Sequence, residues 1–123
     1  METSDYRNLT VWQKAIDLVV EIYGLTSKLP KDELFGLTNQ LRRAAVSRPS
    51  NIAEGNGRGS TKEYLHFLYI ARGSKSEVET QLMICLALKY LKESDIENAM
   101  GLCTEISKML NKLILKLNKK EKI

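Results

Sequence analysis

The sequence contains few of the residues that interrupt helices or support other fold classes. Its 123 residues include only two prolines, two cysteines and one histidine. The long stretches between the prolines are rich in Leu, Lys, Glu and Ala, which favour helix over strand. Because Cys85 and Cys103 fall on apolar helix faces, we interpret both as free core thiols of a protein from a reducing compartment. The composition therefore predicts an all-α protein that folds without disulfides.

Long apolar segments and a secretory leader are also missing. The longest apolar run covers seven residues, Leu82 to Leu88, whereas about 20 are needed to cross a bilayer. The first residues, Met1 to Asp5, are acidic and lack the basic and apolar regions of a secretory signal. We therefore expect a cytoplasmic protein that does not interact with membranes.

The single histidine argues against catalysis. Glu63-Tyr64-Leu65-His66 matches the Glu-x-x-His pattern of di-iron bundles, but such a site needs two copies of the pattern and two further Glu residues. A Ser-His-Asp set would need this same histidine, and no base is expected beside either cysteine. We predict no metal, no cofactor and no enzymatic activity.

A glycine-rich stretch from Gly55 to Lys62 leaves two interpretations open. Its glycines expose backbone N–H groups before a helix start, an arrangement that suits phosphate. It lacks the Gly-Lys-Ser/Thr ending and the preceding strand of a P-loop. The stretch is either a tight flexible link or a nucleic-acid contact that uses Arg58 and Lys62.

Capping signals divide the chain into four helices. In a capping box, a Ser or Thr side chain accepts from a backbone N–H and a Glu or Gln three residues later reciprocates. Such pairs occur at Thr10–Gln13, Ser60–Glu63 and Ser94–Glu97, and a further helix begins after Pro30. We predict helices over residues 10–28, 31–54, 60–91 and 94–118. Short links favour an antiparallel up-and-down four-helix bundle, one domain over residues 1–123 with short disordered ends at about 1–6 and 119–123.

Apolar residues at spacings of three and four predict the buried face of each helix. The line in the first helix is Trp12, Ile16, Val19, Tyr23 and Thr26. The line in the third is Phe67, Ala71, Ser74, Val78, Leu82, Cys85 and Leu88. The last helix has the clearest pattern, with Ile96, Ala99, Cys103, Ile106, Leu110, Leu113 and Leu117.

The chain carries more apolar surface than one bundle buries. Residues 82–88 are apolar all round their helix, and a helix that is apolar on every side is normally buried on every side. We therefore predict a homo-oligomer. Its expected subunit interface consists of Met83, Ile84, Leu86, Leu102 and Met109.

Positive charge is concentrated in two segments. Residues 34–62 contain five Lys or Arg against Glu54, a net charge of +4, and residues 108–123 contain six lysines against Glu121, a net charge of +5. Such blocks in a near-neutral remainder favour an anionic partner, most commonly nucleic acid. The row Lys108, Lys112 and Lys116 either complements the helix dipole on a solvated face or contacts phosphates.

Three segments together resemble a known family. They are Leu-Thr-Val-Trp-Gln-Lys-Ala at 9–15, Phe-Gly-Leu-Thr-Asn-Gln-Leu-Arg-Arg-Ala-Ala-Val-Ser-Arg-Pro-Ser-Asn-Ile-Ala-Glu-Gly at 35–55, and Gly-Ser-Lys-Ser-Glu-Val-Glu-Thr-Gln-Leu at 73–82. Over about residues 6–117 the chain resembles the four-helix-bundle proteins encoded in intervening sequences of bacterial large-subunit ribosomal RNA. That family includes the accessory variability determinant of diversity-generating retroelements. The resemblance implies a ring-like homopentamer with a basic surface that, in the retroelement branch, associates with reverse transcriptase and nucleic acid.

Arg48 departs from the family pattern, in which isoleucine is more usual before the proline. Either its side chain snorkels from the rim of the core, or it points into a subunit interface or a ligand channel. Pro49 lacks an N–H and should bend the second helix. The side chains of Ser47, Ser50 and Asn51 either satisfy the backbone that this bend frees or form a polar site at the bend that holds a ligand.

These features predict a homo-oligomer that binds RNA, DNA or a ribonucleoprotein partner such as a reverse transcriptase. Phosphate contacts would give it little sequence preference. The residues assigned to the contact surface are Arg42, Arg43, Arg48, Arg58, Lys62, Lys108, Lys112 and Lys116. The alternative is a protein-interaction scaffold whose basic surface docks a protein without touching nucleic acid.

Overall fold

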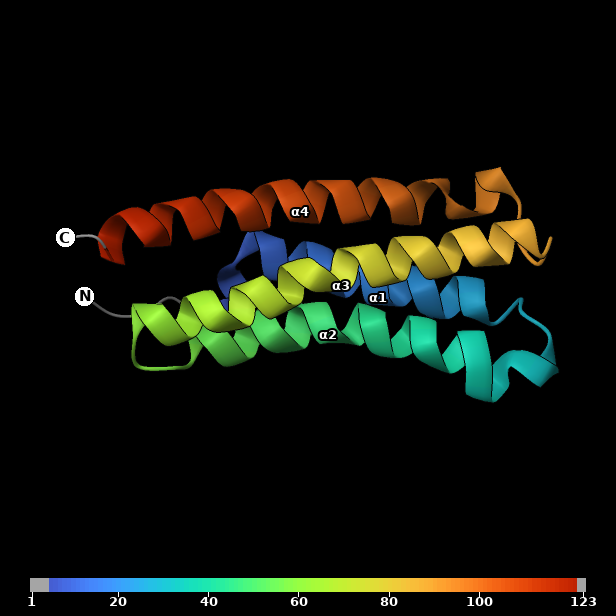
Figure 1. Cartoon of the computed structure of the whole chain (residues 1–123), viewed down its shortest axis with the longest axis horizontal. Coiled ribbons are helices and arrows are strands. Elements are labelled where there is room, and N and C mark those ends of the chain that lie inside the picture. Colours follow the sequence, from blue (N-terminus) through green and yellow to red (C-terminus); the bar gives the residue numbers. More distant parts are fainter. Residues whose placement is uncertain (1–4, 122–123) are drawn as a thin grey trace.

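The computed structural model describes residues 5–121 and contains four long helices (Figure 1). They are α1 (Thr10–Thr26), α2 (Asn39–Asn56), α3 (Thr61–Ala87) and α4 (Glu93–Glu121). A short 3₁₀ helix, η1 (Tyr6–Asn8), precedes α1, and two short turns, η2 (Lys31–Glu33) and η3 (Leu34–Thr38), lead into α2. Residues 5–121 contain no strand, so the predicted all-α fold is confirmed.

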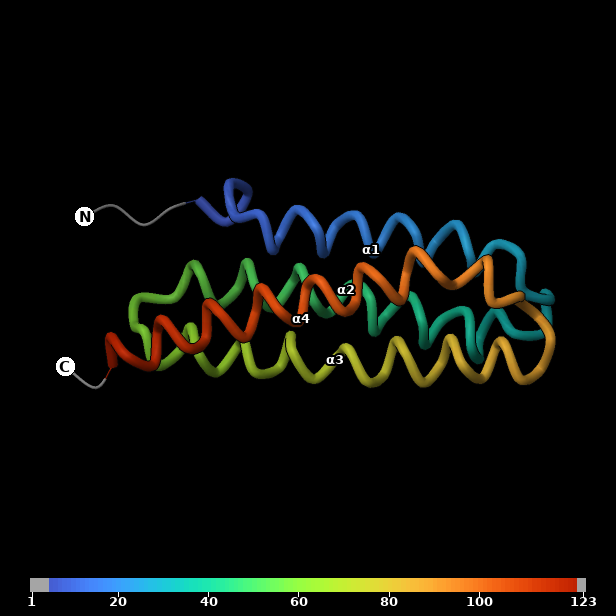
Figure 2. Tube along the Cα trace, turned by 90° about the horizontal axis from the view of Figure 1, so that it is seen from above, coloured from blue at the N-terminus to red at the C-terminus, as the bar shows by residue number. Residues whose placement is uncertain are grey.

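The helices form an antiparallel up-and-down bundle. Each packs against two neighbours, in the cyclic order α1, α2, α3, α4 and back to α1. Figure 2 shows α4 lying over the space between α1 and α3, with α2 beneath. Consequently α2 and α4 are diagonal to each other, and the start of α1, the link from α2 to α3 and the end of α4 share one end of the bundle.

The buried face of α1 differs from the predicted one. The core residues are Val11, Ala15, Leu18, Ile22 and Leu25, together with Thr26. Trp12, Ile16 and Val19 are only partly buried, and Tyr23 is 43% exposed. Both lines have helical spacing and lie about 100° apart around the helix, so only packing against the other helices decides between them.

The predicted faces of α3 and α4 are largely confirmed. In α3 the line from Ala71 to Cys85 is buried, whereas Phe67 is partly buried and Leu88 is half exposed. In α4 the line from Ile96 to Leu110 is buried, after which Ile114 takes the core position. Leu113 and Leu117 pack against the core from its edge.

Of the three predicted capping boxes, only Ser60–Glu63 marks a helix start, and only the first of its two hydrogen bonds to the backbone is formed. The Ser60 hydroxyl accepts from the Glu63 N–H at 3.2 Å and lies 3.4 Å from the Glu63 carboxylate. Thr10 is instead inside α1, whose N-cap is Leu9. Ser94 is likewise inside α4, where the Asp95 carboxylate accepts from the Lys92 N–H at 2.9 Å. Both predictions were therefore wrong by one or two positions. Leu9 caps α1 without a side-chain hydrogen bond, and at α4 the Asp95 carboxylate takes the role predicted for Ser94.

The entry to α2 is irregular. The predicted helix over 31–54 is interrupted at Gly36, whose φ and ψ are both −112°, and the regular helix begins at Asn39. α2 then continues through Pro49 as one helix. Beside the proline, the Asn51 amide donates to the Ser47 carbonyl at 2.8 Å and the Ser47 hydroxyl at 3.0 Å.

The helix ends also differ from those predicted. α3 stops at Ala87 because Lys89 adopts a left-handed conformation with φ 64°, which turns the chain towards α4. α4 continues to Glu121, beyond the predicted end at 118. The rest of the expected disordered ends, residues 1–4 and 122–123, lies outside the described residues. Within residues 5–121, each helix is too short or too polar to span a bilayer.

Candidate nucleic-acid interface

The C-terminal half of α4 presents a row of unpaired cations. Lys108, Lys112, Lys116, Lys119 and Lys120 are all exposed, and no Asp or Glu lies between Glu105 and Glu121. Among the described residues, none of these ammonium groups lies within 4.0 Å of a carboxylate. Their charge is therefore free to act on an external anion. We call these five residues the lysine row.

The adjacent helix α3 extends this positive surface. Arg72 donates to the Asn111 side chain of α4 at 3.1 Å, and its guanidinium lies 5.1 Å from the centre of the Tyr69 ring. Asn118 of α4 donates to the Tyr69 hydroxyl at 3.2 Å. These two contacts hold α3 against α4 beside the lysine row, so Arg72 joins the row on one exposed face.

On its other side, the lysine row borders an apolar groove between α1 and α4. The groove has a volume of about 830 Å³. Its lining residues are Leu9, Thr10, Val11, Met109, Lys112, Leu113, Leu115, Lys116 and Lys119. We call this feature the α1–α4 groove. It combines hydrocarbon walls with three ammonium groups and has no carboxylate in its lining.

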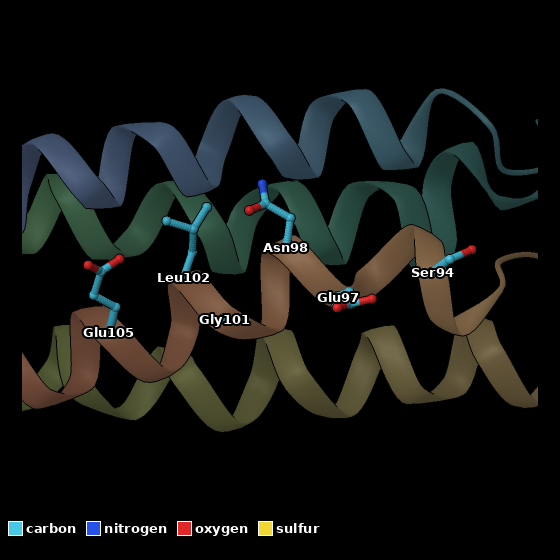
Figure 3. A pocket seen from close by; sticks show the side chains of 6 residues that line it. All are labelled: Ser94, Glu97, Asn98, Gly101, Leu102 and Glu105. Carbon is cyan, nitrogen blue, oxygen red and sulfur yellow. The ribbon is translucent and has the colours of Figure 1, made fainter.

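The N-terminal half of α4 has the opposite charge. Figure 3 shows a shallow hollow there, lined by Glu97, Gly101, Leu102 and Glu105 together with Ser94 and Asn98. Glu105 forms an ion pair with Lys14 of α1 at 3.6 Å. Two carboxylates in this hollow disfavour a phosphate, so the charge of α4 divides the helix into an acidic and a basic half.

The glycine-rich link brings Arg58 and Lys62 to the basic end of the bundle, but their charges are not equally available. Arg58 forms ion pairs with Glu54 at 2.8 Å and Glu63 at 3.7 Å, and its guanidinium lies 4.9 Å from the Phe67 ring centre. Lys62 is exposed and forms no ion pair within residues 5–121. Arg58 is therefore paired within the fold, whereas Lys62 is not.

Arg42 and Arg43 lie away from the lysine row, on the diagonal helix α2. The Nε of Arg42 donates to the Thr26 hydroxyl at 2.8 Å, and its guanidinium lies 4.4 Å from the Tyr23 ring centre. Arg43 is exposed beside two shallow hollows along α2. Of the 34–62 segment, the fold therefore brings only Arg58 and Lys62 to the end of the bundle that carries the lysine row.

Arg48 is fully buried, with 0% exposure. The prediction that it contacts nucleic acid is therefore wrong for this chain, and so is its interpretation as a side chain at the rim of the core. Its Nη2 donates to the Ser107 hydroxyl of α4 at 3.3 Å, so the side chain crosses the bundle along its diagonal. Burial lowers the pKa of Arg48, and nearby Cys103 and Glu79 oppose that shift.

The guanidinium of Arg48 is poorly satisfied. Among residues 5–121, no acceptor lies within hydrogen-bond distance of its Nε or Nη1. Nearby, the Ser74 hydroxyl donates to the Ser47 hydroxyl at 3.1 Å, which adds a polar contact between α2 and α3. An unpaired buried charge is costly, so this polar layer weakens the centre of the bundle.

The comparisons with known proteins agree with this fold. The sequence profile of the 23S rRNA-intervening sequence protein family matches residues 7–112. The chain belongs to this family. It is also similar to the crystal structure of a protein of unknown function from the S23 ribosomal protein family of Bacteroides thetaiotaomicron. The TM-score is 0.79 and the sequence identity 26%, over 85% of this chain and 98% of that one. No curated protein matches the chain.

This membership confirms the resemblance read from the three sequence segments. The profile match includes Lys108 and Lys112 and ends before Lys116, so the last part of the lysine row lies beyond it.

The apolar residues assigned to a subunit interface occupy two environments. Met83 is 50% and Ile84 41% exposed on α3, whereas Leu86, Leu102 and Met109 are partly buried against the core of the same chain. Val20 of α1, which was not assigned, is 68% exposed. The exposed apolar surface is thus larger than predicted and extends to α1.

The remaining chemistry-bearing side chains are dispersed. His66 is exposed and packs edge-on against Phe67, with ring centres 5.3 Å apart. Residues 5–121 contain no group of three His, Cys, Asp or Glu placed to hold a metal ion. Both cysteines are buried free thiols, as expected. Burial raises the pKa of Cys103 to about 11, and Arg48 partly opposes this shift.

Sequence reasoning missed Arg72 and the α1–α4 groove. Arg72 is isolated in the sequence, and only the packing of α3 against α4 places it beside the lysine row. The groove arises because Leu9 and Val11 face α4, whereas the sequence-based line for α1 began at Trp12. The signal in the sequence that could have revealed the groove is a second apolar line in the first helix, which begins at Val11, one residue before Trp12.

Proposed function

We propose that this protein is a cytoplasmic, non-catalytic, homo-oligomeric binder of nucleic acid that contacts phosphates through the lysine row of α4. The observation that carries the proposal is the stretch of α4 from Lys108 to Lys120, which has five exposed lysines, no Asp or Glu and no ion pair within the described residues. Arg72 and Lys62 supply further charge at the same end of the bundle.

The position of the charges supports phosphate binding over simple helix stabilisation. The helix dipole acts mainly within the last turn of a helix, which for α4 includes Lys119 and Lys120. Lys108 and Lys112 lie two to three turns further back, where lysines four residues apart repel each other. The negative charge of a bound polyanion would offset that repulsion, and the release of its counterions would favour binding further.

Self-association would strengthen weak contacts. A homo-oligomer, which family resemblance suggests is a pentamer, would cover exposed apolar residues such as Val20, Met83 and Ile84. It would also repeat the lysine row in each subunit, so that one strand could contact several rows at once. The family name makes RNA the first polymer to test, and a reverse transcriptase remains the proposed protein partner.

A matched pair of variants tests the proposal. The first is Lys108→Gln/Lys112→Gln/Lys116→Gln, which removes three charges from the lysine row. The control is Lys31→Gln/Lys89→Gln/Lys92→Gln, which removes three exposed lysine charges from the opposite end. Glutamine removes the charge, stays polar and has a helix propensity similar to that of lysine. Fluorescence anisotropy with labelled RNA and DNA at two salt concentrations measures affinity and its salt dependence.

We expect wild-type affinity to fall steeply with salt, at about 0.7 to 0.9 log units per phosphate contact for each log unit of salt. The salt slope of the lysine-row variant should be smaller by the equivalent of up to three phosphate contacts. The control variant should keep the wild-type slope. If neither RNA nor DNA binds at low salt, the proposal is wrong. The basic face would then be a docking site for a protein.

A further inference from the structure

The position of the α1–α4 groove beside the lysine row carries a more specific inference. Three of its lining residues, Lys112, Lys116 and Lys119, belong to the row, and the others are mainly apolar. Its volume of about 830 Å³ lies within the range of roughly 300–1,000 Å³ that is common for ligand sites. An anionic polymer that follows the lysines therefore passes directly over an apolar surface.

Leu115 is the most exposed part of that surface. It is 59% exposed although it lies between charged neighbours on α4. Met109 and Leu113 are partly buried and line the same groove, together with Leu9 and Val11 of α1. Phosphates alone give no reason for apolar walls at this place, because phosphate contacts require only cations and hydrogen-bond donors.

The spacing of the lysines suits a strand that runs along the helix. Residues four apart rise by about 6 Å along an α-helix, so Lys108, Lys112 and Lys116 can each meet a different phosphate of one strand. In a duplex the bases are stacked and paired inside, where they cannot enter a groove beside the backbone. In a single strand the bases are free to turn towards protein surfaces.

We propose that the α1–α4 groove receives unstacked bases of single-stranded RNA or DNA while the lysine row contacts their phosphates, so that the site prefers single strands to duplexes. This inference rests on the proposed function. The groove offers the bases apolar contact and only a few polar groups, the Thr10 hydroxyl among them. The preference is accordingly for unpaired strands and not for a base sequence.

The test compares an unstructured labelled RNA with its duplex, and the same pair in DNA, by fluorescence anisotropy at one salt concentration. The variant Met109→Gln/Leu115→Gln makes the groove polar and keeps every lysine. The control Leu34→Gln/Phe35→Gln makes the same change at two exposed positions of η3, at the other end of the bundle. Circular dichroism checks folding, and Leu115→Gln alone carries the test if the double variant unfolds.

We expect wild-type protein to bind the single strand more tightly than the duplex. The groove variant should lose about fivefold of its single-strand affinity, equivalent to about 1 kcal/mol at 1.4 kcal/mol per tenfold, with unchanged duplex affinity and salt slope. The control should match wild type. Equal binding of both forms, or a groove variant that keeps its preference, would overturn this inference alone. If the wild-type protein binds neither RNA nor DNA at low salt, the proposed function is wrong as well.

Competition with an acidic amphipathic peptide tests the other candidate occupant of the groove, which is a segment of a partner protein. The inference is wrong if three results are seen together: the peptide binds the wild-type protein, Met109→Gln/Leu115→Gln weakens that binding, and the protein shows no preference for single strands. The groove would then be a protein docking site. If the peptide fails to displace single-stranded RNA, the assignment to nucleic acid is supported.

Discussion

The two basic segments of this chain have similar net charges in the sequence and very different roles in the fold. In the segment that contains α2, Arg48 is buried, Arg42 is bound to Thr26 and stacked on Tyr23, and Arg58 is paired with two carboxylates. In α4 the lysines are exposed and unpaired within the described residues. The difference follows from side-chain chemistry, because the planar guanidinium of Arg forms several directed contacts, whereas the Lys ammonium is more strongly hydrated.

The comparison teaches that formal charge is a poor measure of available charge. Residues 34–62 carry a net charge of +4, yet only Arg43 and Lys62 in that segment are exposed and free of an ion pair or stacking contact within residues 5–121. A basic segment therefore indicates a binding surface only after its internal partners are known. Three substitutions can break or sharpen this comparison.

The largest effect on stability is expected at Arg48. Arg48→Met removes a buried charge with two unpaired nitrogens and keeps much of the side-chain volume. Replacing buried ionic groups by apolar ones is often neutral or stabilising by about 1–4 kcal/mol, and we expect the free energy of unfolding to rise within that range. Urea denaturation measures it. Arg43→Met is the exposed control and should change stability by less than about 0.5 kcal/mol. A less stable Arg48→Met protein would mean that the guanidinium is well satisfied in solution.

A smaller effect is expected at Arg42. Arg42→Ala loses the hydrogen bond to Thr26 and the contact with the Tyr23 ring. We expect the free energy of unfolding to fall by about 1–2 kcal/mol, with RNA affinity close to wild type because the side chain is already engaged within the fold. Thermal unfolding and anisotropy measure the two quantities. A large loss of affinity with unchanged stability would place Arg42 in the binding surface and contradict the comparison.

The smallest effect on stability, and of opposite sign, is expected in the lysine row. Lys112→Glu converts two repulsive pairs, with Lys108 and Lys116, into attractive ones, each worth about 0.2–0.5 kcal/mol. The free energy of unfolding should therefore rise slightly at low salt while nucleic-acid affinity falls. Lys31→Glu provides the control at the other end of the bundle. If Lys112→Glu is less stable than wild type, the lysine row has a structural role that the contacts do not explain.

Much of the architecture could be predicted from the sequence. The spacing of Ile96, Ala99, Cys103 and Ile106 placed the core face of α4 correctly, and Ser60–Glu63 marked the start of α3. The failures arose where two local patterns were equally good. Thr10 and Ser94 lie inside their helices instead of capping them, and the buried line of α1 runs through Val11 and not through Trp12.

The candidate surface was predictable only in part. Lys108, Lys112 and Lys116 form a row in any helix, because residues four apart share a face. Arg48 could not be placed, since it is buried by the packing of the bundle and its hydrogen-bond partner, Ser107, lies on the diagonal helix, far away in the sequence. Arg72 and the groove between α1 and α4 could not be predicted either, because both depend on contacts between different helices.

The sequence by itself determined the helices, their number and the charged row along α4, because these depend on local propensity and on a repeat of 3.6 residues. The tertiary structure alone decided which cations remain available, which of two apolar lines on α1 faces inward, and that the lysine row borders an apolar groove. The physical reason is that burial and pairing depend on neighbours from other helices. Those contacts are long-range, and no local pattern in the chain records them.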